Sequence, residues 1–267
     1  LGHKQDGFPE RWEVFITAPN ITDYDKYYEN LWNHSYPCTP EKIFVDAEIH
    51  DGVKRCMQSK EHGRPDLVLL GDSHVEHLYY GLAISQPNLN IAYYSKGKPF
   101  LSNPDYRDIF SELSENNHAQ GVVVAMHYRG IPQQKIRDEL SELIEFLISS
   151  NKRVLILGDN PYFDVPIGNC IYYRLEDNPC IQNKGEMLYT PDHYNDILTN
   201  LSQHYSVPYI DIFNAFCEKS KCSSFDRKGF ALYSDQVHLN EEGSLIAAEY
   251  LKKDARYSEY IGDLQQH

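Results

Sequence analysis

A serine, an aspartate and a histidine stand in two short motifs that together could catalyse acyl transfer. Ser73 follows Gly71 and Asp72, and Asp235 precedes His238 by three positions. A nucleophilic serine needs a base to accept its proton and an acid to orient that base, and a histidine and a carboxylate supply both. The two motifs therefore predict a site of nucleophilic catalysis.

The Ser73 motif stands where an apolar run passes into a helical stretch. A buried strand is expected over 66–70, Gly71 allows a tight turn, and Ser73 opens a helix expected over 73–84. The hydroxyl would then lie at a helix N-terminus, where the helix dipole and free N–H groups favour developing negative charge. Each motif alone has a simpler explanation: a capping serine in the first, and a capping aspartate beside a surface histidine in the second.

Apolar runs of strand length alternate with helical stretches from residue 64 onward. Such strands are typical of a parallel sheet that is covered by helices on both faces, and ligands bind beyond the carboxyl ends of its strands. The Ser73 motif and Gly97 are expected at that edge. Strands are predicted over 66–70, 89–94, 121–126, 152–157 and 207–210, and helices over 73–84, 134–149, 191–205 and 241–251.

The length of 267 residues suits one large domain with an extension. Residues 1–64 are rich in aromatic side chains, with a helix plausible over 22–32, so we expect an extension that packs on the core. Residues 65–257 form the main domain and residues 258–267 a C-terminal tail. The chain begins at Leu1 without a signal-type segment, so we expect it to be part of a longer protein.

Composition argues against a nucleic-acid partner, a disordered chain and a membrane-spanning helix. The formal net charge is −14, which disfavours nucleic acid, and 41% of residues are hydrophobic, which argues against disorder. No apolar run approaches the roughly 20 residues that a membrane-spanning helix needs.

Six cysteines without a Cys-x-x-Cys motif suggest disulfides formed in an oxidising compartment. Six cysteines allow 15 connectivities. Proximity favours three pairs, each closing a short loop; the alternative is six reduced thiols. The favoured pairs are Cys38–Cys56, Cys170–Cys180 and Cys217–Cys222. The second pair would tie down the irregular insertion over 158–190.

The combination of the two motifs, in the order Ser, Asp, His, resembles the SGNH (GDSL) hydrolase superfamily over residues 65–255. The resemblance implies a flavodoxin-like three-layer α/β/α sandwich with a five-stranded parallel sheet, in the α/β class. It also implies Ser73 as nucleophile, His238 as general base and Asp235 as the residue that orients the base.

The family's oxyanion hole is only partly recognisable. Gly97 matches the second sequence block and would donate its N–H, together with that of Ser73. The third block, normally Gly-x-Asn-Asp, is replaced by 122–129, which lacks the asparagine. Either His127 takes its place, or the hole depends on Ser73 and Gly97 alone.

This departure, the paired cysteines and the aromatic extension narrow the resemblance to the periplasmic SGNH domain fused behind acyltransferase-3 membrane domains. Such proteins O-acetylate bacterial surface polysaccharides, including the O-antigen of lipopolysaccharide. The resemblance implies an acetyl-serine intermediate, a glycan acceptor, and an acetyl group brought by the membrane domain, from acetyl-CoA, to the periplasmic face of the inner membrane. No cofactor bound by the domain itself is implied. A secreted carbohydrate or lipid esterase and a non-catalytic glycan-binding module remain as alternatives.

Other residues near the motifs have open roles. His74 and His77 lie three apart but lack a third ligand, so no metal site is predicted. Arg129 would bind an acidic or phosphorylated acceptor or form a surface salt bridge. Aromatic residues that could stack on a sugar are Tyr128, Tyr162, Phe163, Tyr172 and Tyr173.

Overall fold

The computed structural model describes residues 31, 33–50, 52–115, 119–170, 178–187 and 189–265. Within them, the main sheet has seven strands in the order β1-β4-β6-β5-β7-β8-β10. Of the predicted helix over 22–32, only Leu31 belongs to the described residues. The strands of the main sheet are β1 (Tyr36–Pro37), β4 (Cys56–Gln58), β5 (Leu67–Gly71), β6 (Ile91–Ser95), β7 (Gly121–Ala125), β8 (Arg153–Leu157) and β10 (Tyr209–Ile210).

Five neighbouring strands, β6, β5, β7, β8 and β10, confirm the predicted parallel sheet. β5 lies at its centre, with Leu67 opposite Ile91 of β6 on one side and Gly121 of β7 on the other. The sheet is wider than the predicted five strands because β4 pairs antiparallel with β6, and β1 with β4. These two added strands belong to the N-terminal extension and are too short to have a period that the sequence could reveal.

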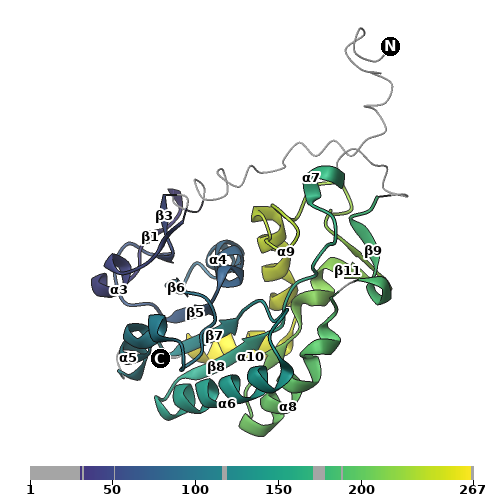
Figure 1. Ribbon diagram of the computed structural model, residues 1–267. Coiled ribbons are helices and arrows are strands. Elements are labelled where there is room, and N and C mark those ends of the chain that lie inside the picture. The colour runs from purple at the N-terminus through teal and green to yellow at the C-terminus, as the bar shows by residue number, and fades with distance from the viewer. Residues whose placement is uncertain are drawn as a thin grey trace, which may run out of the picture.

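Helices cover both faces of the sheet. Figure 1 shows α4 and α9 on one face and α5, α6 and α8 on the other, and α10 packs in the same core as α4 and α9. Side chains of β5 alternate between the two layers. Leu67 and Leu69 join the core beneath α4 and α9, whereas Val68 and Leu70 join the core against α5 and α6. The α/β three-layer prediction is therefore confirmed. These helices are α4 (Ser73–Ser85), α5 (Arg107–Ser114), α6 (Gln133–Ser149), α8 (Asn195–Tyr205), α9 (Glu241–Lys252) and α10 (Ala255–Leu264).

Most of the stretch predicted as a C-terminal tail, residues 258–267, is instead helix α10. Tyr257, Tyr260, Ile261 and Leu264 are buried. The Tyr260 hydroxyl donates to the Arg153 carbonyl (3.2 Å). α10 therefore completes one layer of the core, beside the end of the sheet where β8 begins.

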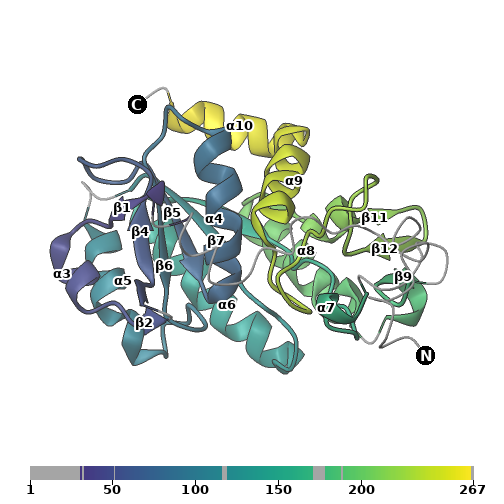
Figure 2. The ribbon, with the colours of Figure 1, turned by 90° about the horizontal axis from the view of Figure 1, so that it is seen from above.

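The three predicted disulfides are all present, which confirms the pairing by proximity. Two of them stabilise the region around a small antiparallel sheet, β11-β12-β9, which lies beside α9 (Figure 2). Cys170–Cys180 closes the insertion, and Cys217–Cys222 joins paired positions of β11 and β12. The elements of this region are α7 (Ile167–Cys170), β9 (Ile181–Asn183), β11 (Cys217–Glu218) and β12 (Lys221–Ser223).

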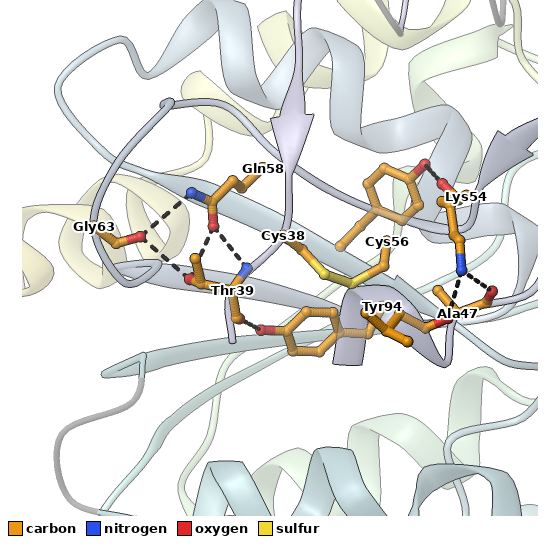
Figure 3. Close-up of a disulfide and its surroundings, with 10 residues drawn as sticks. Cys38, Thr39, Ala47, Lys54, Cys56, Gln58, Gly63 and Tyr94 are labelled. Carbon is orange, nitrogen blue, oxygen red and sulfur yellow. Dashed lines mark hydrogen bonds between the residues drawn. A yellow bond between two sulfur atoms is a disulfide. The ribbon is translucent and has the colours of Figure 1, made fainter. Parts of the chain in front are cut away.

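The third disulfide, Cys38–Cys56, joins two segments of the extension, the residue after β1 and the first residue of β4, at the edge of the main sheet (Figure 3). Beside it, the Gln58 amide oxygen accepts from both the N–H and the hydroxyl of Thr39 (3.0 Å each). The Tyr94 hydroxyl of β6 donates to the Thr39 carbonyl (2.7 Å). The extension also contains α3 (Glu41–Val45) and the hairpin of β2 (Ile49–His50) and β3 (Val53–Lys54).

Removing Cys38–Cys56 by a double serine substitution should lower the free energy of unfolding by about 3 kcal/mol, since the loss grows with the logarithm of the closed loop. The pair is separated by 18 positions, whereas Cys217 and Cys222 are separated by only 5. The same substitution at the second pair should cost only about 2 kcal/mol. Urea unfolding of both variants measures this order, and the reverse order would contradict the loop argument.

Within the described ranges, every helix is too short or too polar to span a lipid bilayer.

Candidate active site

The structure brings Ser73, Asp235 and His238 into one hydrogen-bonded chain. The Ser73 hydroxyl lies 2.8 Å from His238 Nε2, and His238 Nδ1 lies 2.6 Å from an Asp235 carboxylate oxygen. A carboxylate at Nδ1 fixes that nitrogen as the protonated one, which leaves Nε2 free to accept the serine proton. This geometry suits general-base activation of a serine; the catalytic roles of the three residues stay a prediction.

Two tight backbone approaches set this geometry. Ser73 is the first residue of α4, and His238 lies just before α9, so the packing of these two helices positions the pair. At Gly81 the helices approach so closely that an added Cβ would lie 2.1 Å from the Ser244 carbonyl oxygen. The Ser244 hydroxyl accepts from the Gly81 N–H (2.8 Å). At the turn before Ser73, a Cβ on Gly71 would meet the carbonyl of Ala125 at 1.8 Å.

The loop that carries Asp235 is held by the aspartate itself. Its second carboxylate oxygen accepts from the N–H groups of Val237 and His238, both at 2.7 Å. Burial raises the pKa of Asp235, but the hydrogen bond and charge of His238 and the two backbone bonds outweigh burial, so the pKa lies below its ordinary value. Asp235 is therefore ionised at neutral pH.

The amide groups of Ser73 and Gly97 are available for an oxyanion. In the described part of the chain, neither N–H donates to a protein acceptor. Gly97 has a φ of +77°, which favours glycine. The Asn103 amide donates to the carbonyls on either side of Gly97 (3.2 and 2.9 Å), and the Tyr106 hydroxyl donates to that of Gly97 (3.2 Å). The loop is thus fixed without using the Gly97 N–H.

Asp72, the residue before the nucleophile, anchors the turn. Its carboxylate accepts from the N–H groups of His74 (3.0 Å) and His127 (3.1 Å) and pairs with the Lys98 ammonium. Burial raises the pKa of Asp72, but the charges of His74 and Lys98 outweigh burial and lower it. Asp72 therefore joins the loops after β5, β6 and β7 at the carboxyl edge of the sheet.

A buried aspartate that the sequence analysis missed, Asp159, organises the histidines of the site. It follows β8 and is 2% exposed. One of its oxygens lies 2.7 Å from His127 Nδ1 and the other 2.8 Å from His74 Nδ1. The two imidazoles stack with their centroids 4.8 Å apart. The only available signal was its place after a strand, in Gly158-Asp159.

His127 is the candidate replacement for the third-block asparagine. Its ring is hydrogen bonded to Asp159, and its backbone N–H donates to the Asp72 carboxylate. The rings link it to the site, because His74 lies 4.8 Å from His127 and 5.7 Å from His238 between centroids. The structure places His127 at the same edge as Ser73. Donation from its ring to an oxyanion stays a prediction.

Replacing Asp159 with asparagine should lower stability at neutral pH by about 1.5–3 kcal/mol, the contribution typical of hydrogen bonds to charged groups. Burial raises the pKa of Asp159, but His74 and His127 lower it far below its ordinary value. A depressed pKa stabilises the fold above the unfolded-state value near 4, and the gain is lost as pH falls below it.

The difference in unfolding free energy between wild type and Asp159→Asn should therefore shrink between pH 5 and about pH 2. Urea unfolding across that range measures it. The exposed Asp138 of α6 supplies the matched control, Asp138→Asn, which should change stability little. An equal loss at all pH values would contradict the assigned role of the Asp159 charge.

Among the described residues, one group of three has the ligand types of a metal site: His74, His127 and Asp159. Its nitrogens lie 2.7 and 2.8 Å from the carboxylate oxygens, the distances of N–H···O hydrogen bonds. Ligands of a tetrahedral zinc would lie about 3.3 Å apart. The group is therefore explained by hydrogen bonds, and His77, the other histidine considered, is buried with its Nδ1 accepting from the Leu239 N–H (3.3 Å). The absence of a metal cofactor stays a prediction.

The aromatic residues considered for sugar stacking differ in how exposed their side chains are. Tyr128 (0% exposed) and Phe163 (1%) belong to the core and cannot contact a glycan. Tyr172 and Tyr173 lie outside the described residues. Tyr162 is half-buried in the loop after β8.

A comparison with protein-family models matches residues 37–253 to the SGNH domain that is fused to AT3 domains. No curated protein sequence matches the chain. The matched span includes all three residues of the hydrogen-bonded chain and most of the described extension.

One solved structure gives the same picture of the fold, and a second is similar at a lower score. The periplasmic domain of a Salmonella Paratyphi A lipopolysaccharide acetyltransferase is similar with a TM-score of 0.65 and 17% identity, over 90% of this chain and 98% of that one. A GDSL-like lipase from Bacteroides thetaiotaomicron is similar at a TM-score of 0.45 and 12% identity, over 72% and 88%. At 17% identity, the likeness to the Salmonella domain concerns the fold alone.

Proposed function

Because the chain belongs to the family of SGNH domains that are fused to AT3 domains, we propose that it transfers an acetyl group to a sugar hydroxyl of a bacterial surface polysaccharide. The family supports a broader statement, an esterase or acyltransferase. The observation that carries the finer proposal is the hydrogen-bonded Ser73–His238–Asp235 chain in a domain of this family. A lipopolysaccharide O-antigen is the proposed acceptor, by analogy with the Salmonella domain.

The proposed mechanism is a double displacement. The Ser73 oxygen attacks the acetyl carbonyl while its proton passes to His238 Nε2, and the carbonyl π electrons move to the oxygen. That oxyanion accepts hydrogen bonds from the free N–H groups of Ser73 and Gly97. The carbonyl re-forms, the bond to the donor breaks, and His238 protonates the leaving group, which leaves acetyl-Ser73.

The second displacement transfers the acetyl group to the sugar and regenerates the free serine. His238 accepts the proton of a sugar hydroxyl, whose oxygen attacks the acetyl-serine carbonyl. The tetrahedral intermediate then expels Ser73, which regains its proton from His238. Water in place of the sugar would give an esterase, the second candidate, and the same residues would act. In the proposed parent protein, an acyltransferase-3 membrane domain brings acetyl groups derived from acetyl-CoA to the periplasmic side.

Mass spectrometry of the intact protein tests the proposal. We expect wild type to gain one acetyl group from an activated acetyl ester, and an O-antigen oligosaccharide to remove that group and become acetylated. Ser73→Ala should gain none.

Loss of the acetyl group to water at the same rate with and without the oligosaccharide would favour the esterase. If wild type gained no acetyl group and turned over no ester, the proposed catalytic role would be wrong.

A further inference from the structure

We propose that Arg129 and Tyr162 form an acceptor subsite for a glycan that carries an anionic group, a carboxylate or a phosphate. This inference rests on the proposed function, because it names the class of acceptor at the same site. It also settles an ambiguity of the sequence, in which Arg129 was either a ligand for an acidic acceptor or half of a surface salt bridge.

The subsite is built from two loops that follow neighbouring parallel strands. Arg129 lies in the loop after β7, two residues beyond His127, and Tyr162 lies in the loop after β8, three residues beyond Asp159. Both loops lie at the carboxyl edge of the sheet, where Ser73 also stands. Since His127 and Asp159 are hydrogen bonded to each other (2.7 Å), the two loops have a fixed relation.

The loop of Tyr162 is joined to the loop of the proposed catalytic acid and base. The Phe163 N–H donates to the Gln236 carbonyl (3.0 Å), and the Gln236 side chain donates to the Asp164 carbonyl (3.1 Å). The Asn160 amide donates to the Val237 carbonyl (2.8 Å), the residue before His238. Tyr162 therefore lies between Asn160 and Phe163, and both of these residues are hydrogen bonded to the loop that carries His238.

Arg129 stacks on Tyr162, with its guanidinium carbon 4.0 Å from the ring centroid. Arg129 is exposed, and no carboxylate of the described residues lies within salt-bridge distance of it. By contrast, the Lys98 ammonium at the same edge is neutralised by Asp72. Stacking occupies one face of the guanidinium and leaves the N–H donors along its edge directed away from the ring.

That donor edge suits a planar or tetrahedral oxyanion. A stacked guanidinium has little freedom left to lose and presents paired N–H groups, the arrangement that binds carboxylates and phosphates in two places at once. The chain as a whole is acidic, with a formal net charge of −14, so an anionic acceptor needs a local cation such as Arg129 to offset the general repulsion. The Tyr162 ring beside it offers apolar surface for the C–H face of a sugar.

Acceptor pairs that differ only in charge test the subsite. The probes are an oligosaccharide with a uronic acid and its carboxyl-reduced form, and a second pair with and without a phosphate monoester. For Arg129→Met, we expect kcat/KM of transfer to fall about tenfold more for the charged than for the neutral member of a pair. Arg129→Lys keeps the charge but not the paired donors and should recover only part of the loss. The pair that shows the larger difference identifies the anion.

Arg137→Met, which removes an exposed arginine of α6, is the matched control and should affect neither acceptor. Equal losses on charged and neutral acceptors, or no loss at all, would overturn the subsite. Calorimetric binding of the same oligosaccharides to Ser73→Ala, with and without Arg129→Met, gives a readout that needs no catalysis. Charge-dependent binding without acetyl transfer would support the subsite while the proposed function failed, and binding equal for both members of each pair would overturn the subsite alone.

Discussion

Replacing Ser73 with alanine should reduce acetyl transfer by at least about 10³-fold, with the fold intact. Its oxygen is the only protein atom that bonds covalently to the acetyl group in the proposed mechanism. The hydroxyl contributes one hydrogen bond, to His238 Nε2 (2.8 Å), and the side chain is small. The reaction rate and the intact mass after incubation with an acetyl ester measure the loss, and the thermal unfolding midpoint reports the fold.

A serine outside the site supplies the control. Ser114 is exposed at the end of α5, so Ser114→Ala should react like wild type. Asp235→Asn should also reduce transfer strongly, because an amide at His238 Nδ1 permits the wrong tautomer. Retention of an acetylated enzyme in Ser73→Ala would show that another residue is the nucleophile.

Replacing Arg55 with methionine should lower the free energy of unfolding by about 3–5 kcal/mol, the range for removing one partner of a buried ion pair. Arg55 lies in the extension, between β3 and β4, and makes two hydrogen bonds to Glu76 of α4 (2.8 and 2.9 Å). The Glu76 side chain is only 2% exposed. Burial raises its pKa, and Arg55 opposes that rise, so loss of Arg55 leaves a costly buried carboxyl group.

Two further variants separate this explanation from a loss of packing. Adding Glu76→Gln to Arg55→Met should recover part of the stability, because the buried charge is then absent. Lys42→Met removes the exposed pair with Asp108 (2.9 Å) and should change stability by less than about 1 kcal/mol. Urea unfolding of all four proteins measures these differences. A double variant less stable than Arg55→Met would contradict the charge argument.

The Arg55–Glu76 pair also connects the extension to the helix of the candidate nucleophile. Glu76 lies one helical turn after Ser73, so a residue of the extension contacts the helix that positions the nucleophile. With the Cys38–Cys56 disulfide and the pairing of β4 on β6, the extension is part of the same folded unit as the site.

Local signals in the sequence were sufficient for much of this protein. The buried strands are continuous apolar runs, the turn before Ser73 requires Gly71, and cysteines near each other along the chain form the three disulfides. The Asp235–His238 pair is also local, because three positions separate the two residues and the aspartate folds their loop around itself. The spacing of Tyr257, Tyr260, Ile261 and Leu264 carried a helical signal as well, although that segment was expected to be a tail.

Only the tertiary structure decided which distant groups lie together. Asp159 with His74 and His127, Arg55 with Glu76, and Arg129 with Tyr162 are pairings across 21 to 85 positions, computed from their residue numbers. No local sequence pattern around either partner predicts these contacts. These contacts form because the packing of strands and helices brings their members together, and for the two buried ion-pair sites it also removes water from them. That packing is a property of the whole fold.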